Sequence, residues 1–175
     1  MSPIVSFTIN YNVGNAALNS GDNDRAIRAY KKAVTVWEKT ESTTIPSQMM
    51  AMCLTNLGIA YTRKESVVEA IAAFDRSIEI HPSFLMALYN KAWLLEKVGR
   101  IVEAIDTWGT YLKLARADSK EQDSIPEAER HLSLCKVESA LEKQGVPYTK
   151  RSDLIGSLER GDSSGSNEED ADGGA

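Results

Sequence analysis

The sequence predicts an all-α protein: a right-handed α-solenoid of three antiparallel helix pairs followed by a C-terminal capping helix. The main observation is an Ala-Ile pair with a large aromatic residue four positions after the alanine. This pattern occurs three times, at Ala26 with Tyr30, Ala70 with Phe74, and Ala104 with Trp108. The copies are 44 and 34 residues apart. Repeats of this length are typical of stacked helical units that cannot bury their apolar faces alone.

Residues that stop helices divide the first half of the chain. Gly21 and Asp22 interrupt the helical periodicity between the first two predicted helices. The segment 40–46 is polar, rich in threonine and ends in Pro46, so it predicts the loop that lengthens the first spacing. The predicted helices span about 7–20, 24–38, 47–64, 66–81, 83–98, 101–116 and 124–144.

Capping signals mark the later helices. Ser66 with Glu69, and Ser124 with Glu127, match the S-x-x-E capping box that opens a helix. Ser83 is expected to cap the fifth helix. The fourth helix should end before Pro82 and the fifth at Gly99, while the seventh should end near the segment 145–147.

The seventh helix carries an apolar stripe that would cover the exposed edge of the last repeat, so we interpret it as a cap. The chain is therefore predicted to form one repeat domain over 1–145 and a flexible acidic tail over 146–175. Beyond Gly161 the Gly, Ser and acidic composition predicts disorder. Within the tail, the segment 152–158 holds three large apolar residues, and we hypothesise that it folds back into the binding groove and blocks it.

Small residues stand twelve positions before each alanine of the pattern: Gly14, Gly58 and Ala92. Together with the alanines they would let two helices approach closely, and the aromatic residues would fill the adjoining space. This pattern resembles the tetratricopeptide repeat family, with repeats at about 7–40, 51–84 and 85–118. The second copy shows it best, with the family residues Leu54, Leu57, Gly58, Tyr61, Ala70, Phe74, Ser77 and Pro82.

The resemblance implies that the first helix of each pair lines a concave peptide-binding groove. The residues it assigns there are Tyr11, Asn12, Asn15, Met52, Asn56, Ile59, Arg63, Met86, Tyr89, Asn90, Trp93 and Lys97. Asn12, Asn56 and Asn90 share one repeat position, so they would form a ladder whose amides pair with a peptide backbone. The alternative is that asparagine at this position is only family consensus. Trp93 is the best candidate for an exposed aromatic that contacts a partner.

Some relatives in this family, associated with chaperones, grip C-terminal carboxylates with two lysines, an arginine and two asparagines. Asn15 and Asn56 match the two asparagines by position. Tyr11 and Met86 replace the lysines, and Asn90 replaces the arginine. Without these cations the charge-assisted capture of a carboxylate is largely lost, although Arg63 and Lys97 could compensate in part.

Composition excludes several classes of function. Five acids and no bases lie in 162–172, which leaves twenty acids and twenty bases in 1–160 and no basic field for nucleic acid. No apolar run is long enough to span a membrane and no secretory signal is visible, which favours the cytoplasm. Cys53 and Cys135 show no metal or redox spacing, so buried free thiols are expected.

No enzymatic chemistry is indicated. The segment 161–165 matches G-x-S-x-G, but that motif needs a strand-to-helix turn and here lies in the acidic tail. His81 and His131 are fifty residues apart, and no cofactor or metal site is expected. We therefore expect a protein-interaction adaptor or assembly co-chaperone that binds a peptide or helix of another protein. The alternative is a scaffold that self-associates through its exposed solenoid ends.

Overall fold

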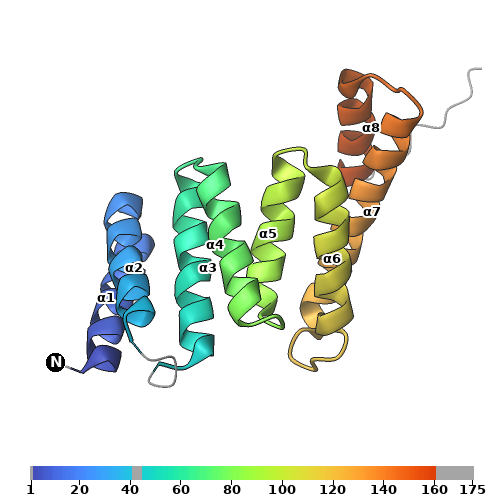
Figure 1. Cartoon of the computed structure of the whole chain (residues 1–175). Helices are drawn as coiled ribbons and strands as arrows, with labels where there is room; N and C mark the ends of the chain where they lie inside the picture. The colour runs from blue at the N-terminus through green and yellow to red at the C-terminus, as the bar shows by residue number, and fades with distance from the viewer. Residues whose placement is uncertain (1, 41–44, 161–175) are drawn as a thin grey trace, which may run out of the picture.

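The computed structural model describes residues 2–40 and 45–160, and these form helices without any β-strand. Figure 1 shows the helices standing side by side in an elongated stack. Eight α-helices and one short 3-10 helix make up this part of the chain: α1 (Pro3–Asn19), α2 (Asn23–Glu38), α3 (Ser47–Arg63), α4 (Val67–Ile80), α5 (Leu85–Lys97), α6 (Ile101–Ala115), η1 (Gln122–Ser124), α7 (Ile125–Lys143) and α8 (Tyr148–Arg160). The protein is a helical-repeat solenoid, as predicted.

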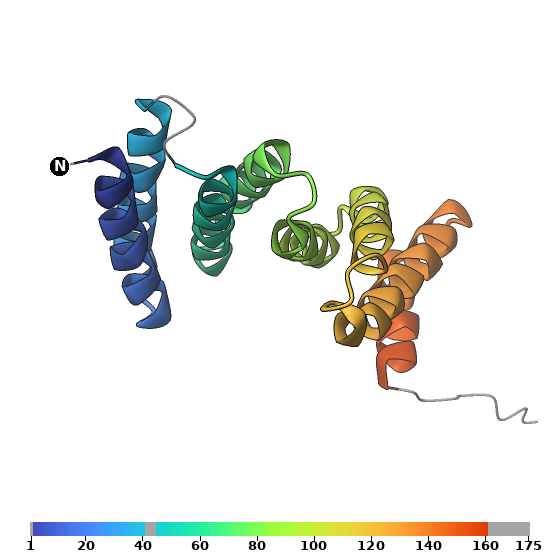
Figure 2. The ribbon, with the colours of Figure 1, turned by 90° about the horizontal axis from the view of Figure 1, so that it is seen from below.

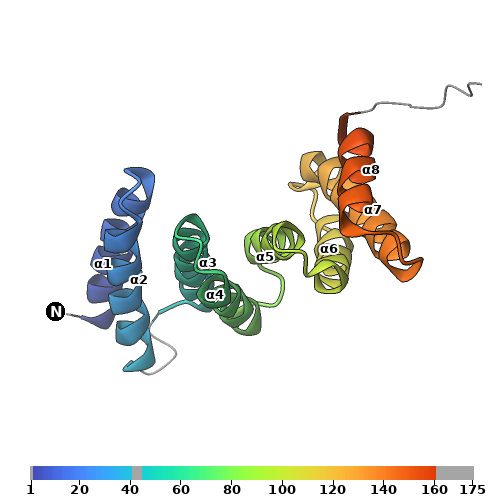
Figure 3. The ribbon, with the colours of Figure 1, turned by 90° about the horizontal axis from the view of Figure 1, so that it is seen from above.

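The helices pack in three consecutive pairs, α1 with α2, α3 with α4, and α5 with α6. The views from below and above show the pairs advancing along one direction (Figures 2 and 3). Each second helix also packs on the first helix of the following pair. The first helices contact one another as well, α1 with α3 and α3 with α5. They therefore form one row along one side of the stack.

The turn inside each pair uses the same backbone conformation. Gly21, Glu65 and Gly99 occupy equivalent repeat positions, and all three have a positive φ, at 81°, 58° and 75°. Glycine adopts this left-handed conformation without a Cβ clash, whereas glutamate does so at a cost. The middle turn is therefore the strained one of the three.

The capping boxes are a correction to the sequence prediction. Ser66 and Ser124 do stand at the N-caps of α4 and α7, but neither side chain makes a capping hydrogen bond. The Ser124 hydroxyl lies instead 2.7 Å from both the Tyr111 hydroxyl and the Glu121 carbonyl oxygen. Ser83 does not cap α5, because Phe84 holds that position. Helix α2 does have a side-chain cap, because the Arg25 amide donates to the Asp22 carboxylate at 3.0 Å.

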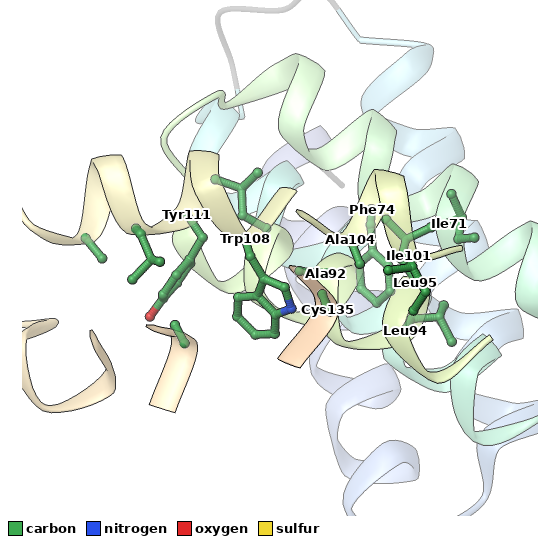
Figure 4. Packing of buried hydrophobic residues seen from close by; sticks show 14 of the residues in the cluster. Ile71, Phe74, Ala92, Leu94, Leu95, Ile101, Ala104, Trp108, Tyr111 and Cys135 are labelled. Carbon is green, nitrogen blue, oxygen red and sulfur yellow. The ribbon is translucent and has the colours of Figure 1, made fainter. Parts of the chain in front are cut away.

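Close packing between small and large residues is confirmed. A Cβ atom added to Gly14 would meet the Tyr30 ring at less than 3.0 Å, and one added to Gly58 would meet the Phe74 ring in the same way. Ala92 and Trp108 are both fully buried in the C-terminal part of the core. Figure 4 shows Phe74, Trp108 and Tyr111 as the aromatic side chains of that cluster. The repeat pattern therefore marks the contact between the two helices of each pair.

Two boundaries differ from the prediction. Helix α1 begins at Pro3, about one turn earlier than expected, because Pro3 fits the first turn of a helix. The expected flexible tail over 146–175 is wrong for the residues Tyr148–Arg160, which form α8 and pack against α7. Arg151 attaches this helix through an ion pair with Glu142 at 3.2 Å. The remaining tail, 161–175, lies outside the described residues, as does the G-x-S-x-G match.

Candidate functional site

The row of first helices brings the predicted groove residues of α1 and α3 together. The Asn15 Oδ1 atom accepts two hydrogen bonds, from the Tyr30 hydroxyl at 2.7 Å and from Asn56 Nδ2 at 3.0 Å. The Tyr11 hydroxyl lies 3.5 Å from the same Asn56 nitrogen. Burial raises the pKa of the Tyr30 hydroxyl well above its usual value. We call Tyr11, Asn15, Tyr30 and Asn56 the amide cluster; it is uncharged and joins the first two repeats.

The three ladder asparagines have different surroundings. Asn56 is engaged in the amide cluster, and Asn90 Nδ2 donates to the Met86 carbonyl oxygen of its own helix at 2.7 Å. Asn12 is exposed on α1. The equivalent positions therefore do not present three free amides, and Asn12 has the amide most open to solvent.

Three large apolar side chains are exposed on α3 and α5. Met52 lies on α3 and is 36% exposed, while Met86 and Trp93 lie on α5 and are 52% and 38% exposed. The Lys97 ammonium stands 5.2 Å from the centre of the Trp93 ring. A cation above an indole face stabilises the ring's orientation while one side stays accessible. We call Met52, Met86 and Trp93 the apolar face.

Tyr89 and Asn90 lie beside Met86 at a small cavity. The cavity has a volume of about 220 Å³ and is also lined by Tyr111 and Ser124. Tyr89 meets the rings of Trp108 and Tyr111 edge-on at 5.1 and 5.5 Å, so it belongs partly to the core. Burial raises the pKa of its hydroxyl. The cavity could receive one small apolar side chain next to Met86.

Two of the predicted groove residues have structural contacts. Arg63 donates from Nη1 to the Leu18 carbonyl oxygen at 2.8 Å, which satisfies a backbone group near the C-terminus of α1. Ile59 is half-buried and packs against two buried hydrophobic clusters, one that contains Tyr30 and one that contains Trp108. Ile59 is therefore less accessible than the apolar face, whereas Arg63 is exposed although its guanidinium is engaged with Leu18.

A charged cluster near the C-terminal end was not foreseen. Glu96 accepts a hydrogen bond from Trp108 Nε1 at 3.2 Å, and His131 Nδ1 lies 3.0 Å from both of its carboxylate oxygens. The His131 ring stacks on Trp108 with centroids 5.2 Å apart. We call these three residues the carboxylate cluster; it links α5, α6 and α7. From the sequence, His131 was considered only as a metal ligand, and its burial against α6 shows a structural role instead.

Helix α8 shares a cleft with the C-terminal end of α5. The cleft has a volume of about 610 Å³ and is lined by Lys97 and Glu96 on one side and by residues of α8, including Ile155, on the other. Ile155 is half-buried, while Leu154 and Leu158 are exposed. The fold-back of segment 152–158 into the groove stays a hypothesis, and only Ile155 of its three apolar residues lines this cleft.

The cysteines are buried free thiols, as predicted. Burial raises the pKa of both Cys53 and Cys135 to about 12, with Glu96 contributing at Cys135. Thiols that ionise so reluctantly are poor nucleophiles. Within residues 2–40 and 45–160, no group of three or more metal-ligating side chains is placed to hold an ion. None of the described helices is long and apolar enough to cross a membrane.

Comparison with known families assigns this architecture. Two sequence profiles described as "Tetratricopeptide repeat" match residues 11–83 and 73–106. Together they cover more than half of the chain. The chain belongs to the tetratricopeptide repeat family.

Curated relatives extend beyond this chain. It is 25% identical over 123 residues to outer dynein arm-docking complex subunit 4 of Xenopus laevis, covering 70% of this chain and 22% of that protein. It is 28% identical over 91 residues to protein unc-45 homolog B of Xenopus laevis, covering 52% of this chain and 9% of that protein. The chain thus spans less than a quarter of the length of these relatives.

Solved structures share the fold at low identity. The C-terminal domain of a putative FK506-binding protein from Plasmodium falciparum has a TM-score of 0.66 at 17% identity, over 81% of this chain and 93% of that one. The TPR2B domain of yeast Sti1, in its pHsp70 complex, has a TM-score of 0.64 at 19% identity, over 75% and 97%. The second TPR domain of human RPAP3, in complex with the HSP70 peptide SGPTIEEVD, has a TM-score of 0.61 at 20% identity, over 77% and 98%.

Proposed function

We propose that the tetratricopeptide repeat domain binds a peptide or helix segment of another protein along its row of first helices. The chain would then work as an adaptor or assembly co-chaperone. The observation that carries this proposal is the apolar face, Met52, Met86 and Trp93, exposed on consecutive first helices. Exposed aromatic and methionine side chains on a rigid scaffold are typical of binding hot spots.

The amide cluster supports this proposal by keeping the first two repeats in register. Its hydrogen bonds hold Tyr11 and Asn15 of α1 against Asn56 of α3. A rigid surface loses little conformational entropy when a partner binds. The exposed Asn12 amide beside this cluster could pair with a partner's backbone, because an amide both donates and accepts.

The comparisons favour a protein partner, since two similar structures are complexes named for Hsp70 or an HSP70 peptide. The family is typically a non-catalytic interaction module. The electrostatics here favour a neutral partner segment over a C-terminal carboxylate. Tyr11, Met86 and Asn90 occupy the positions where the clamp has its cations, and Arg63 already bonds to Leu18. The cytoplasmic location stays a prediction.

The first experiment measures the affinity of peptides selected from a random-peptide phage library against the intact chain. We expect Trp93→Ala and Met86→Ala to weaken binding by about tenfold or more, as hot-spot truncation does. The matched control is Val68→Ala, because Val68 is 77% exposed but lies on the second helix α4. Selected peptides whose affinity does not change with Trp93→Ala and Met86→Ala would contradict the proposal.

A second experiment separates neutral recognition from carboxylate capture. The probe is the peptide SGPTIEEVD, with a free or an amidated C-terminus, measured by fluorescence anisotropy. A clamp that bound the free carboxylate would lose about tenfold or more in affinity on amidation, because a charge-assisted hydrogen bond is lost. Since the cations of the clamp are missing here, we expect the two forms to have affinities within about threefold of each other. Binding of the free acid that amidation abolishes would show that a clamp operates despite the missing cations.

A further inference from the structure

The outer face of α1 carries an apolar stripe that nothing in the described residues covers. Val5, Ile9 and Val13 are 46%, 49% and 38% exposed. They are spaced by four residues, so they lie along one side of the helix. Tyr11 and Asn15 lie on the side of α1 that meets α3. The stripe is therefore separate from the proposed peptide-binding surface.

Comparison with the equivalent positions of the second repeat shows what kind of secondary-structure element could pack on this stripe. The positions of Ile9 and Val13 correspond, 44 residues later, to Cys53 and Leu57 of α3. Both of these are buried, and the Cys53 thiol lies 3.8 Å from the Tyr30 carbonyl oxygen of α2. In α3 this face therefore packs on the preceding helix. In α1 the same face has large apolar residues and no preceding helix within the described chain, so it is suited to receive a helix.

The geometry points to a second copy of this chain as the occupant, with the two α1 helices packed antiparallel about a twofold axis at Ile9. An axis at Ile9 places Ile9 against its own copy and Val5 against Val13 of the partner copy, because the stripe is symmetric about Ile9. Helix α1 contains no charged residue from Pro3 to Asn19. No like-charge repulsion therefore opposes pairing of two identical faces.

The size of the stripe sets the expected strength of this dimer. A helix of 17 residues is about 25 Å long. One such face offers less area than the roughly 800 Å² per partner of a standard stable interface. Monomer and dimer should therefore exchange, with the dimer favoured at high concentration. The pairing leaves the apolar face on α3 and α5 open in both copies.

Sedimentation velocity of the full chain at increasing concentration is the first test. We expect mass to rise from monomer to dimer and to stop there. Ile9→Glu and Ile9→Lys should each raise the dimer dissociation constant more than tenfold, and an equimolar mixture of the two should dimerise again, because opposite charges then meet at the axis. Val68→Glu is the matched control, an exposed valine on α4 that should leave dimerisation unchanged.

A crosslinking test fixes the geometry. Ile9→Cys should form a disulfide-linked dimer under mild oxidation, whereas Val102→Cys, on the exposed face of α6, should not. The native thiols are buried and do not compete. Circular dichroism confirms that each variant is folded. A monomer at every concentration, mass growth beyond the dimer, or a dimer that tolerates Ile9→Glu would each overturn the inference; growth beyond the dimer would indicate head-to-tail stacking instead.

Discussion

The two ends of the solenoid hold equivalent aromatic residues in different ways. At the N-terminal end, Tyr30 is anchored by the neutral Asn15 of the amide cluster at 2.7 Å. At the C-terminal end, Trp108 is anchored by the charged Glu96 of the carboxylate cluster at 3.2 Å. In the middle repeat, Phe74 has no polar atom and packs against Gly58. All three repeats thus have a large aromatic ring at this position, but the polar group that contacts the ring differs from one repeat to the next.

The largest effect is expected at Trp108, because its fully buried ring contacts Tyr89, Tyr111 and His131. Trp108→Ala should lower the free energy of unfolding by about 3–5 kcal/mol, as large-to-small core substitutions do. Urea denaturation measures the change. A loss below about 1 kcal/mol would show that the capping helix does not depend on this ring.

Removing Asn15, the neutral anchor at the N-terminal end, should lower the free energy of unfolding by less than Trp108→Ala does. Asn15→Ala leaves the buried Tyr30 hydroxyl without its acceptor and should cost about 1–3 kcal/mol. Adding Tyr30→Phe removes that orphaned hydroxyl and makes the first repeat resemble the second, so the double variant should recover part of the loss. Urea denaturation of Asn15→Ala, Tyr30→Phe and the double variant measures this coupling, and additive losses would contradict it.

These differences mark how far the sequence could predict the structure. The repeat alanines, Gly14 and Gly58 predicted the helix pairs and their contacts, because spacing and residue size act locally and repeat. The partners of Asn15 and Glu96 were not predictable, since hydrogen bonds between helices depend on distances that only the packed structure sets. The groove residues of the sequence prediction therefore separated into an engaged set around Asn56 and an exposed set around Trp93.

Helix α8 was missed for a different reason. The segment 148–160 is largely polar and follows Gly145 and Pro147, so composition favoured a tail. Its attachment depends on the ion pair between Arg151 and Glu142, and on Ile155 at the cleft beside α5. A charge pairing between helices leaves no periodic trace in a sequence.

The turns offer a smaller test of the repeat comparison. Glu65 has a φ of 58°, while Gly21 and Gly99 take up the same conformation at the equivalent positions. Glu65→Gly should stabilise the protein by about 0.5–1 kcal/mol, the relief of left-handed strain less the extra entropy of an unfolded glycine. Thermal unfolding measures it. A lower melting temperature would mean that the glutamate side chain contributes more than its backbone costs.

The smallest effect concerns pH and should appear only at the charged end. Burial raises the pKa of Glu138, nearby Glu142 and Glu96 raise it further, and Arg151 opposes them. A carboxyl whose pKa is raised on folding binds its proton more tightly when folded, so its ionised form costs stability at neutral pH. Glu138→Gln should therefore stabilise the protein at pH 7 by a few tenths of a kcal/mol, since the group is half-exposed.

That gain should shrink as the pH falls through the raised pKa of Glu138. It should vanish below the ordinary range of a glutamate, where Glu138 is protonated in both the folded and the unfolded protein. Melting temperatures of the two proteins over this range provide the measurement. Asn15→Ala is the matched control, because the amide cluster contains no carboxylate and its effect should not change over the same range. A gain from Glu138→Gln that grows on acidification would contradict the assigned sign.

The central claim is that the row of first helices binds a partner segment, and the chain's three tryptophans allow a direct test. The measurement is the ¹⁵N–¹H spectrum of the indole groups during titration with a library-selected peptide. Trp93 lies on the apolar face, while Trp37 lies on the second helix α2. We expect the Trp93 resonance to shift progressively and that of Trp37 to stay in place. Saturable binding that shifts Trp37 and leaves Trp93 unchanged would contradict the account.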